Sequence, residues 1–248
     1  LACNYSAKGR MSEPEDIVEE IERYSIFSKF ENFDIALKGK KILITSGRTK
    51  ENIDPVRYLS NNSSGKMGYS LAQAAVDLGA EVTLISGPTN LKVPNGLEKF
   101  IFVESALEMY EKVDEYFKNT DIFIACAAVA DYRPKEYKKE KIKKSDSDFV
   151  IELVRNPDIL LEMRKKKEKQ LLVGFAAETN NIKENSLKKL EKKNLDIIVA
   201  NDASVMGSDE NVIEIIKKDR TSVEISQKSK IELAYDILNE VIFELKKR

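Results

Sequence analysis

The 248-residue chain has no histidine and only two cysteines, Cys3 and Cys126. Without histidine, the Ser-His-Asp and Cys-His arrangements of nucleophilic catalysis and all imidazole metal sites are excluded. The two cysteines lie far apart and form no C-x-x-C pair, so the sequence indicates neither a disulfide framework nor a zinc knuckle. Chemistry must come from lysine, arginine, carboxylate, amide and hydroxyl groups, with Mg²⁺ carried by phosphates as the compatible metal.

A large net charge and a long hydrophobic run are also missing. Lys and Arg total 41 against 42 Asp and Glu, a formal charge of -1, so there is no general reason to expect a nucleic-acid or acidic-membrane partner. No apolar run approaches the roughly 20 residues that cross a bilayer, and the N-terminus has no signal-peptide pattern. We therefore expect a cytoplasmic protein.

Short apolar segments alternate with helical patterns along most of the chain. This alternation predicts an α/β fold: a Rossmann-like, doubly wound, mostly parallel sheet with helices on both faces. The predicted strands are 41–45, 81–86, 100–103, 121–127, 171–176 and 196–200, and the predicted helices are 68–79, 105–118, 157–169 and 182–193.

The two ends of the chain have their own patterns. A helix pattern begins at Ser12, which is placed to cap it. Alternating segments at 211–216 and 221–225 predict an antiparallel hairpin, followed by a helix over 228–247. An edge of this kind often pairs with a second subunit, so we expect a homodimer. The charged segment 135–148 has no apolar stripe and is predicted to be a mobile surface loop.

The segment from Asp54 to Gly68 reads DPVRYLSNNSSGKMG and lies between the first predicted strand and helix. A loop of backbone N–H groups before a helix N-terminus forms a cradle for anions. Arg57 and Asn61 could act on an anion held there, and Ser63 and Ser64 add hydroxyl groups. A plain glycine-rich turn is the alternative. We interpret the segment as the phosphate and substrate loop of an enzyme.

Other candidates follow later strands, where ligands bind in doubly wound sheets. Ala127 and Ala128 would let a ligand approach the backbone, although they are equally explained by helix–sheet packing. Asp131 could hold a metal or a ribose hydroxyl, or cap a turn. Cys126 is expected to be an inert core residue.

A third group follows at the next strand. Asn156 and Pro157 are typical of a helix start, with Asn156 as the cap. Phe175 is placed to stack on a base, and Lys189 and Lys193 lie one helical turn apart, which suits a phosphate chain. Lysines on a helix face are more often simply solvated.

Familiar nucleotide motifs are incomplete. A Walker motif fails because Ser60 and Met67 occupy two of its required positions, and no G-x-G-x-x-G follows Gly47. Tyr137 and Lys141 have the Y-x-x-x-K spacing of short-chain dehydrogenases, but without the glycine-rich loop or an apolar helix face. An NAD(P)-dependent oxidoreductase therefore stays the alternative, beside a non-catalytic dimerisation module.

Six motifs taken together are more specific: DPVRYLSNNSSGKMG, AAVADYRP, EKIKK, NPDI, GFAAET and KNLD. In this order and at these spacings, over roughly 40–200, the chain closely resembles the phosphopantothenoylcysteine synthetase family. The resemblance implies a CTP-dependent ligase of coenzyme A biosynthesis. In that family 4'-phosphopantothenate is activated to an acyl-cytidylate with loss of pyrophosphate, and the amine of L-cysteine then displaces CMP.

The same resemblance implies roles for individual residues. Lys141, in EKIKK, assists the first step, and Asn61 serves the acyl-cytidylate. Arg57, Asn61 and Ala128 would contact phosphopantothenate, and Asp131 is the candidate ligand for Mg²⁺. The implied CTP site comprises Ala127, Asp131, Lys141, Pro157, Asp158, Ile159, Leu160, Phe175, Lys189 and Lys193.

Residues 2–14 are similar to the closing segment of phosphopantothenoylcysteine decarboxylase, the flavoprotein usually fused ahead of the synthetase. Asn4 and Tyr5 replace its usual glycine and aspartate. With Leu1 at the start, this implies a fragment of a bifunctional protein, in which 1–38 is a linker and helix and 39–248 is the synthetase domain. FMN would belong to the absent decarboxylase domain, and Cys3 would have no role here.

Overall fold

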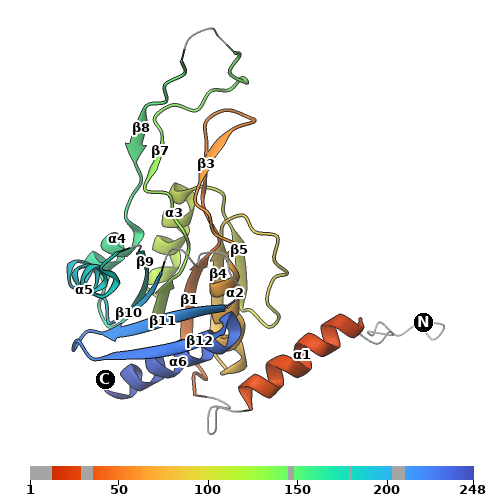
Figure 1. Cartoon of the computed structure of the whole chain (residues 1–248), viewed down its shortest axis with the longest axis vertical. Coiled ribbons are helices and arrows are strands. Elements are labelled where there is room, and N and C mark those ends of the chain that lie inside the picture. The colour runs from red at the N-terminus through yellow and green to blue at the C-terminus, as the bar shows by residue number, and fades with distance from the viewer. Residues whose placement is uncertain (1–12, 29–35, 145–147, 179, 203–209) are drawn as a thin grey trace, which may run out of the picture. The chain divides into compact units, whose positions relative to one another are not determined.

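A computed structural model describes residues 13–28, 36–144, 148–178, 180–202 and 210–248 (Figure 1). Ser12 and Cys3 lie outside the described residues. The chain divides into two compact units, residues 1–33 and 34–248. The predicted boundary after residue 38 depends on the decarboxylase resemblance and stays a prediction.

The first unit contributes one helix, α1, which spans Pro14–Phe27. Proline suits the first helical turn because its missing N–H would have no partner there. Glu13 occupies the N-cap position without a side-chain cap bond. Val18, Ile21 and Tyr24 are all more than half exposed and lie three residues apart, so they follow one side of the helix.

The second unit is built on one eight-stranded sheet with the order β12-β11-β10-β9-β6-β1-β4-β5. Six strands from β5 to β10 pair in parallel, and β11 and β12 join antiparallel at one edge. This confirms the predicted fold class, including the C-terminal hairpin. The strands are β1 (Lys41–Ser46), β4 (Glu81–Ser86), β5 (Lys99–Phe102), β6 (Ile122–Ala125), β9 (Leu171–Glu178), β10 (Ile197–Asp202), β11 (Glu210–Lys217) and β12 (Ser222–Ser229).

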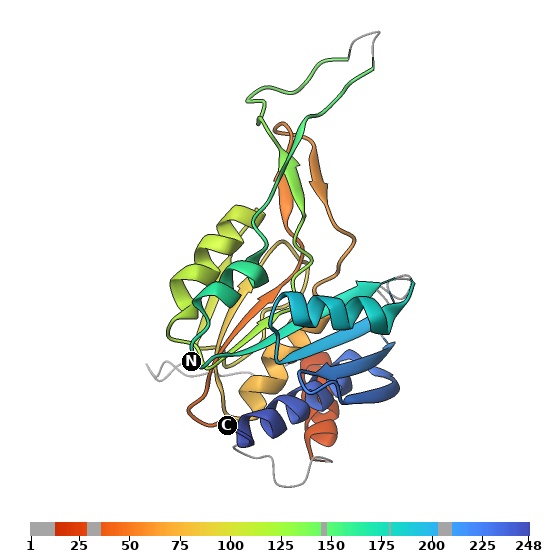
Figure 2. The ribbon, with the colours of Figure 1, turned by 90° about the vertical axis from the view of Figure 1, so that its left-hand side faces the viewer.

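Helices cover both faces of this sheet (Figure 2). On one face, α2 (Lys66–Asp77) packs against α6 (Lys230–Lys246), and the Tyr235 hydroxyl donates to Asp77 at 2.6 Å. On the other face, α3 (Ala106–Phe117), α4 (Ile159–Lys166) and α5 (Ile182–Lys192) share one apolar cluster with the strands. The sheet is therefore the middle layer of three.

The central strands are apolar because both of their faces are covered. Ile42, Leu43 and Ile44 of β1 are at most 1% exposed. Burial of such a side chain stabilises the fold by roughly 1.5–3 kcal/mol. Phe117 of α3 meets Phe123 of β6 edge to face, with ring centroids 5.9 Å apart, a favoured aromatic geometry.

Side chains that accept hydrogen bonds start three of the helices. The Ser105 and Asp158 side chains accept from the backbone three residues on, and Ser229 forms a full capping box with Glu232. The prediction that Asn156 caps α4 is wrong. The Asn156 amide instead donates to the Ala130 carbonyl at 2.8 Å.

Two hairpins were missed by the sequence analysis. The first pairs β2 (Lys50–Asn52) with β3 (Tyr58–Ser60), and the second pairs β7 (Tyr132–Pro134) with β8 (Leu153–Arg155). Both project beyond the carboxyl end of β1 (Figure 1), and we call residues 50–60 and 132–155 together the arm. Predicted loop 135–148 forms its outer part, without helix or strand among the described residues.

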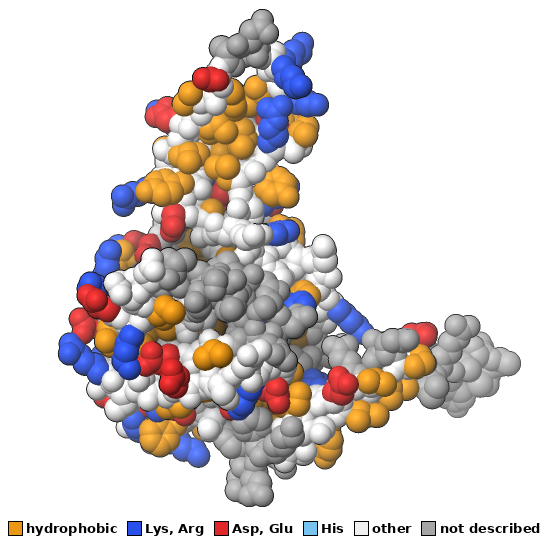
Figure 3. All heavy atoms as spheres, viewed as in Figure 1, with side chains coloured by type: hydrophobic (Ala, Val, Ile, Leu, Met, Phe, Trp, Pro, Cys, Tyr) orange, Lys and Arg blue, Asp and Glu red, His pale blue; other side chains and the backbone are white. Residues whose placement is uncertain are grey.

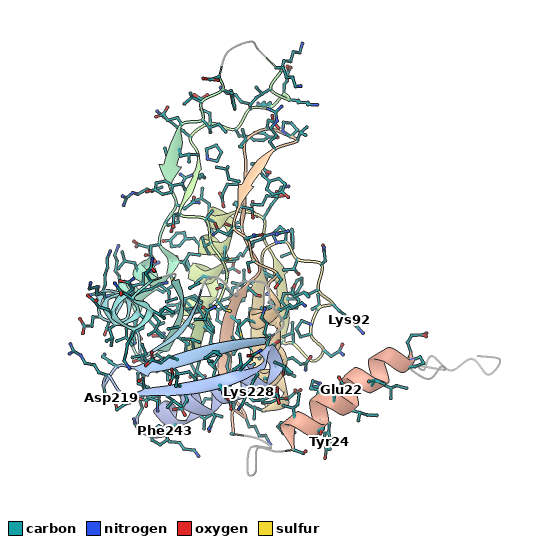
Figure 4. The ribbon with its side chains drawn as sticks, viewed as in Figure 1. Glu22, Tyr24, Lys92, Asp219, Lys228 and Phe243 are labelled. Carbon is teal, nitrogen blue, oxygen red and sulfur yellow. The ribbon has the colours of Figure 1, made fainter. Side chains whose placement is uncertain are left out.

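The C-terminal hairpin is tied to α6. The Phe243 ring lies under the ammonium groups of Lys217 and Lys247, each 4.5 Å from its centroid, and Lys228 pairs with Asp236 at 2.7 Å. Figure 4 labels Phe243 and Lys228 in this region. In the described part of the chain, no helix is both long and apolar enough to span a membrane.

Candidate functional site

The strand order reverses at β1. The chain runs from β1 to β4 and β5 on one side and then returns to β6 on the other. In doubly wound sheets ligands bind beyond the carboxyl ends of the strands at such a switch point, because the connections diverge and leave a crevice. The candidate site is therefore expected between the segments that follow β1 and β6.

Asn61 and Ala128 meet at this point. The Asn61 Nδ2 donates to the backbone carbonyls of Ala128 at 3.3 Å and Val129 at 3.0 Å. The Thr49 N–H donates to the Ala128 carbonyl, and its hydroxyl accepts from the Ala130 N–H at 2.9 Å. The segment after β6 is thus held from two sides, and the two predicted substrate residues are brought together.

Two glycines allow the backbone to approach closely around this site. Gly47 has φ +77°, and a Cβ there would lie 2.7 Å from the Gly87 carbonyl. A Cβ on Gly68 would lie 2.2 Å from the Ser46 Oγ. Glycine therefore lets α2 sit directly against β1, as its small residues predicted.

In the structure, the residues of the predicted anion cradle lie in two separate parts of the segment 54–68. Arg57 lies in the turn of the β2–β3 hairpin, where Ile53 and Asp54 both donate to its carbonyl. Ser63 is farther along, nearer the start of α2. The interpretation of the whole segment as one loop at the helix N-terminus is wrong, because the chain first forms a hairpin.

Arg57 is instead placed beside the loop that carries Lys141. Its guanidinium donates to the Ile142 carbonyl at 3.2 Å and lies 3.5 Å from the Asp54 carboxylate. Lys141 itself is exposed, and among the described residues its side chain has no hydrogen-bond or ion-pair partner. The arm therefore brings two predicted cationic residues into one region.

Asp54 is a buried carboxylate, 1% exposed, at the centre of this region. It accepts hydrogen bonds from the N–H groups of Val56 and Arg57, both at 2.8 Å, and of Ile142 at 3.2 Å. Burial opposes ionisation, but these backbone hydrogen bonds hold the pKa of Asp54 below its usual range. No role was predicted for Asp54, although an aspartate before Pro-Val-Arg is a sequence signal for such a turn.

Most of the predicted nucleotide residues gather at the carboxyl end of β9 and the start of α4, whereas Lys141 lies apart from them in the arm. The Asn156 N–H donates to the Asp131 carbonyl at 2.8 Å, which places Asp131 beside Pro157. Lys193 Nζ lies 2.8 Å from the Asp158 carboxylate, and Lys189 Nζ donates to the Phe175 carbonyl at 2.6 Å. The set that the structure joins in this way is Asp131, Pro157, Asp158, Phe175, Lys189 and Lys193.

These contacts change the expected role of the two lysines. Lys189 lies on α5, but Lys193 is the residue that ends the helix. Both ammonium groups contact protein oxygens, and the Lys193 side chain is only 16% exposed. A phosphate chain would have to share or replace these oxygens. Ile159 and Leu160 are buried, so they contribute packing at the start of α4.

A protein-built metal cage is absent from the part of the chain that is described: no group of three or more His, Cys, Asp or Glu residues is placed to hold an ion. Asp131 is an exposed single carboxylate. This donor set fits Mg²⁺ that is bound mainly by phosphate oxygens and waters, which is the usual way this ion is held. Asp131 as a metal ligand stays a prediction.

Arg48 is a further candidate that was overlooked. It lies two residues after the end of β1, is half-buried, and forms an isolated bridge with Ala128. Its signal in the sequence was a cation two residues after a buried strand, behind a glycine. With Asn61 and Ala128 it borders the switch point.

Taken together, a Rossmann-like sheet with polar side chains at its switch point defines the class of α/β proteins that bind nucleotides or similar ligands at that edge. The chain belongs to the family described as the DNA/pantothenate metabolism flavoprotein C-terminal domain, whose model matches residues 37–244. This confirms the predicted resemblance.

Individual relatives agree with this family. The chain is 48% identical over 245 residues to the coenzyme A biosynthesis bifunctional protein CoaBC of Bacillus subtilis, covering 97% of this chain and 59% of that protein. It is 46% identical to CoaBC of Haemophilus influenzae, with the same coverage. The chain thus spans about three fifths of the length of these curated relatives.

A solved structure shares the fold closely. The crystal structure of the C-terminal domain of CoaBC is 46% identical and superposes with a TM-score of 0.76, covering 86% of this chain and 99% of that one. The similarity therefore extends over essentially the whole of that C-terminal domain.

Proposed function

We propose that the chain is a phosphopantothenate–cysteine ligase, which joins 4'-phosphopantothenate and L-cysteine with CTP as the activating co-substrate. The comparison with the C-terminal domain of CoaBC carries this proposal, because 99% of that domain is matched at 46% identity. The geometry is consistent with it, since Asn61 and Ala128, whose substrate roles the resemblance implies, meet at the switch point.

In the first step, the carboxylate of phosphopantothenate attacks the α-phosphorus of CTP, and pyrophosphate leaves. This step brings several negative charges together, so fixed cations must neutralise them. Arg57 and Lys141 supply such cations from the arm, and Arg57 is linked to the backbone of the residue after Lys141. Lys141, whose side chain is exposed, neutralises charge on the reacting phosphates.

In the second step, the cysteine amine attacks the acyl carbon, a C–N bond forms, and CMP leaves while the amine loses a proton. Asn61 directs its Nδ2 group to the carbonyls of Ala128 and Val129. This orientation leaves Oδ1 to accept a hydrogen bond from a substrate N–H. The Oδ1 of Asn61 therefore accepts a hydrogen bond from the attacking amine and orients it. If Nδ2 instead donated to the acyl oxygen, one of its two contacts with the backbone carbonyls would be lost.

Lys189 and Lys193 bind the phosphates of CTP, with Phe175 against the base. Lys193 exchanges its contact with Asp158 for a phosphate oxygen, which leaves Asp158 to cap α4 through the Leu161 N–H. Mg²⁺, when bound, neutralises charge on the triphosphate and orients it. Asp131 is its candidate protein ligand.

An NAD(P)-dependent oxidoreductase fits the connection after β1 less well. Dinucleotide-binding proteins use a short glycine-rich turn between the first strand and helix. Here the whole segment 47–65 separates β1 from α2 and contains the β2–β3 hairpin. The family of the chain also favours the ligase.

The protein is further proposed to form a homodimer. Figure 3 shows hydrophobic side chains gathered over the arm. Exposed apolar side chains that gather in one patch usually mark protein–protein contacts. The β12 edge, where the sequence suggested pairing, carries mainly polar side chains. We therefore place the second copy against the arm, whose exposed apolar residues are Val56, Tyr58, Tyr132, Tyr137, Phe149, Val150 and Leu153.

The bifunctional relatives suggest how the chain is used. We propose that segment 1–38 links the ligase to a decarboxylase domain, and that FMN binds only in that domain. A cytoplasmic location, where CTP and cysteine are available, stays part of the proposal.

A calorimetric titration tests the ligase directly. CTP with Mg²⁺ should bind, ATP with Mg²⁺ should bind more weakly, and phosphopantothenate with cysteine and CTP should yield the amide, CMP and pyrophosphate in equal amounts. Binding of neither CTP nor phosphopantothenate would instead favour a non-catalytic dimerisation module.

A further inference from the structure

Asp54 lies between the turn that carries Arg57 and the loop that carries Lys141. We propose that it is a positioning residue, which holds the Lys141 segment in place so that the first half-reaction can occur. The proposal rests on the ligase function for its catalytic consequence, but its structural part is independent of any substrate.

The carboxylate of Asp54 serves two segments at once. One oxygen, Oδ1, accepts from the N–H groups of Val56 and Arg57 and thereby closes the hairpin turn. The other, Oδ2, accepts from the Ile142 N–H, which is 88 residues away in sequence. A group that only closed its own turn would not need the second contact.

Both backbone polar groups of Ile142 are bound in this arrangement. Its N–H donates to Asp54, and its carbonyl accepts from the Arg57 guanidinium at 3.2 Å. Arg57 is in turn paired with Asp54. A second tie joins the Lys138 N–H to the Ile53 carbonyl at 2.9 Å. The backbone on both sides of Lys141 is therefore fixed to the turn, while its side chain stays exposed.

The hairpin that bears this turn is itself anchored to the sheet domain. Glu51, a buried residue of β2, accepts from the Ala106 N–H at the start of α3 at 2.9 Å. Lys50 pairs with Glu104 at 2.7 Å. A chain of contacts through Asp54 and the β2–β3 hairpin thus fixes the position of the Lys141 backbone relative to α3. This matters because a small misplacement of a catalytic group lowers the reaction rate steeply.

Asp54→Asn removes one acceptor while it keeps the size of the side chain. An amide has only one acceptor oxygen, so it cannot serve both the turn and Ile142. The matched control is Glu136→Gln, because Glu136 is an exposed carboxylate of the same loop that pairs only with Lys138 among the described residues. Ile142→Pro is a second variant, since it removes the N–H donor and leaves Asp54 and its turn unchanged.

The experiment combines two measurements on each variant. Hydrogen–deuterium exchange of segment 138–144 reports whether the loop is held, and pyrophosphate release with CTP, Mg²⁺ and phosphopantothenate reports the first half-reaction. For Asp54→Asn and Ile142→Pro we expect faster exchange and about 10- to 100-fold slower pyrophosphate release, with the KM for CTP nearly unchanged. Glu136→Gln should resemble the unsubstituted chain.

Unchanged exchange in a folded Asp54→Asn or Ile142→Pro protein would overturn the proposal. So would faster exchange without slower pyrophosphate release. Because exchange is measured without substrates, it decides the structural part even if the unsubstituted chain releases no pyrophosphate. That last result would count against the ligase function and not against the role of Asp54 in holding the loop.

Discussion

The side-chain amide of Asn61 donates to the backbone carbonyl of Ala128 across the switch point of the sheet, at 3.3 Å. This contact joins the segment after the β2–β3 hairpin to the segment after β6. It also orients the amide, because both N–H groups face backbone carbonyls. The chemistry proposed for the second half-reaction depends on this orientation.

Replacing Asn61 with aspartate should separate the two half-reactions. A carboxylate cannot donate to the carbonyls of Ala128 and Val129, so it is repelled from its present position. We expect pyrophosphate release to persist and amide formation to slow by about 10²-fold. Quenched-flow measurement of both products tests this. Asn95→Asp, at an exposed loop position, is the control, and unchanged turnover of Asn61→Asp to amide would contradict the role of Asn61.

Lys193 is expected to contribute to CTP affinity. Its ammonium already lies beside the start of α4, paired with Asp158 at 2.8 Å, and a phosphate oxygen can replace that partner. Lys193→Gln should weaken CTP binding by about tenfold, equivalent to about 1.4 kcal/mol. Calorimetry measures this difference.

The control for that substitution lies on α5, the helix that Lys193 ends. Lys188→Gln removes an exposed lysine of α5 that pairs with Glu184, and it should leave CTP affinity unchanged. Equal weakening by the two substitutions would show that general charge, and not the position of Lys193, sets the affinity.

Cys126 is partly exposed, but it should react slowly with thiol reagents. Burial raises its pKa from 9.0 to about 12, although nearby Lys230 acts in the opposite direction. The thiolate population at about pH 8 is therefore roughly 10³-fold lower than in the unfolded chain. With Cys3 replaced by serine, Ellman's reagent should label the native protein that much more slowly than the protein in urea.

The same shift gives a direction for stability at high pH. A raised pKa in the folded state favours folding below the unfolded pKa of 9.0, and this contribution is lost as the pH rises towards about 12. A Cys126→Ala protein should therefore lose less stability than its Cys126 parent across that alkaline range. Denaturant unfolding curves provide the comparison, and identical losses would contradict the shift.

The arm is expected to be the dimer contact. Val150, 85% exposed, is placed on the apolar surface, and a buried carboxylate there would be costly. Val150→Glu should shift the protein from dimer to monomer in sedimentation velocity. Val212→Glu, at a half-exposed position of β11, should leave the dimer intact. A monomeric unsubstituted chain would contradict the proposal.

The parallel sheet could be predicted because strands that are buried on both faces, such as β1, are recognisable in the sequence as short apolar runs. The arm could not. Strands β2 and β8 have three residues each and no alternating apolar pattern, so only their pairing partners make them strands. Such pairings join distant segments and are not encoded in local periodicity.

The candidate site, too, could be predicted only in part. Small residues and the Arg57 and Asn61 signals were visible in the sequence, but the neighbours of each side chain depend on which strands lie together. Asn61 reaches Ala128 only because β6 lies beside β1. Asn156 is as good a cap as Asp158 by local rules, yet a contact with Ala130 takes its amide away from α4.

Pyrophosphate release by a Lys141→Gln protein is the decisive test of the proposed ligase mechanism. The assay contains CTP, Mg²⁺ and phosphopantothenate but no cysteine, so it reports only acyl-cytidylate formation. The unsubstituted chain should release pyrophosphate, and Lys141→Gln should release it at least about 10²-fold more slowly, because a fixed positive charge is lost from the transition state. Normal pyrophosphate release by Lys141→Gln would contradict the proposed ligase mechanism.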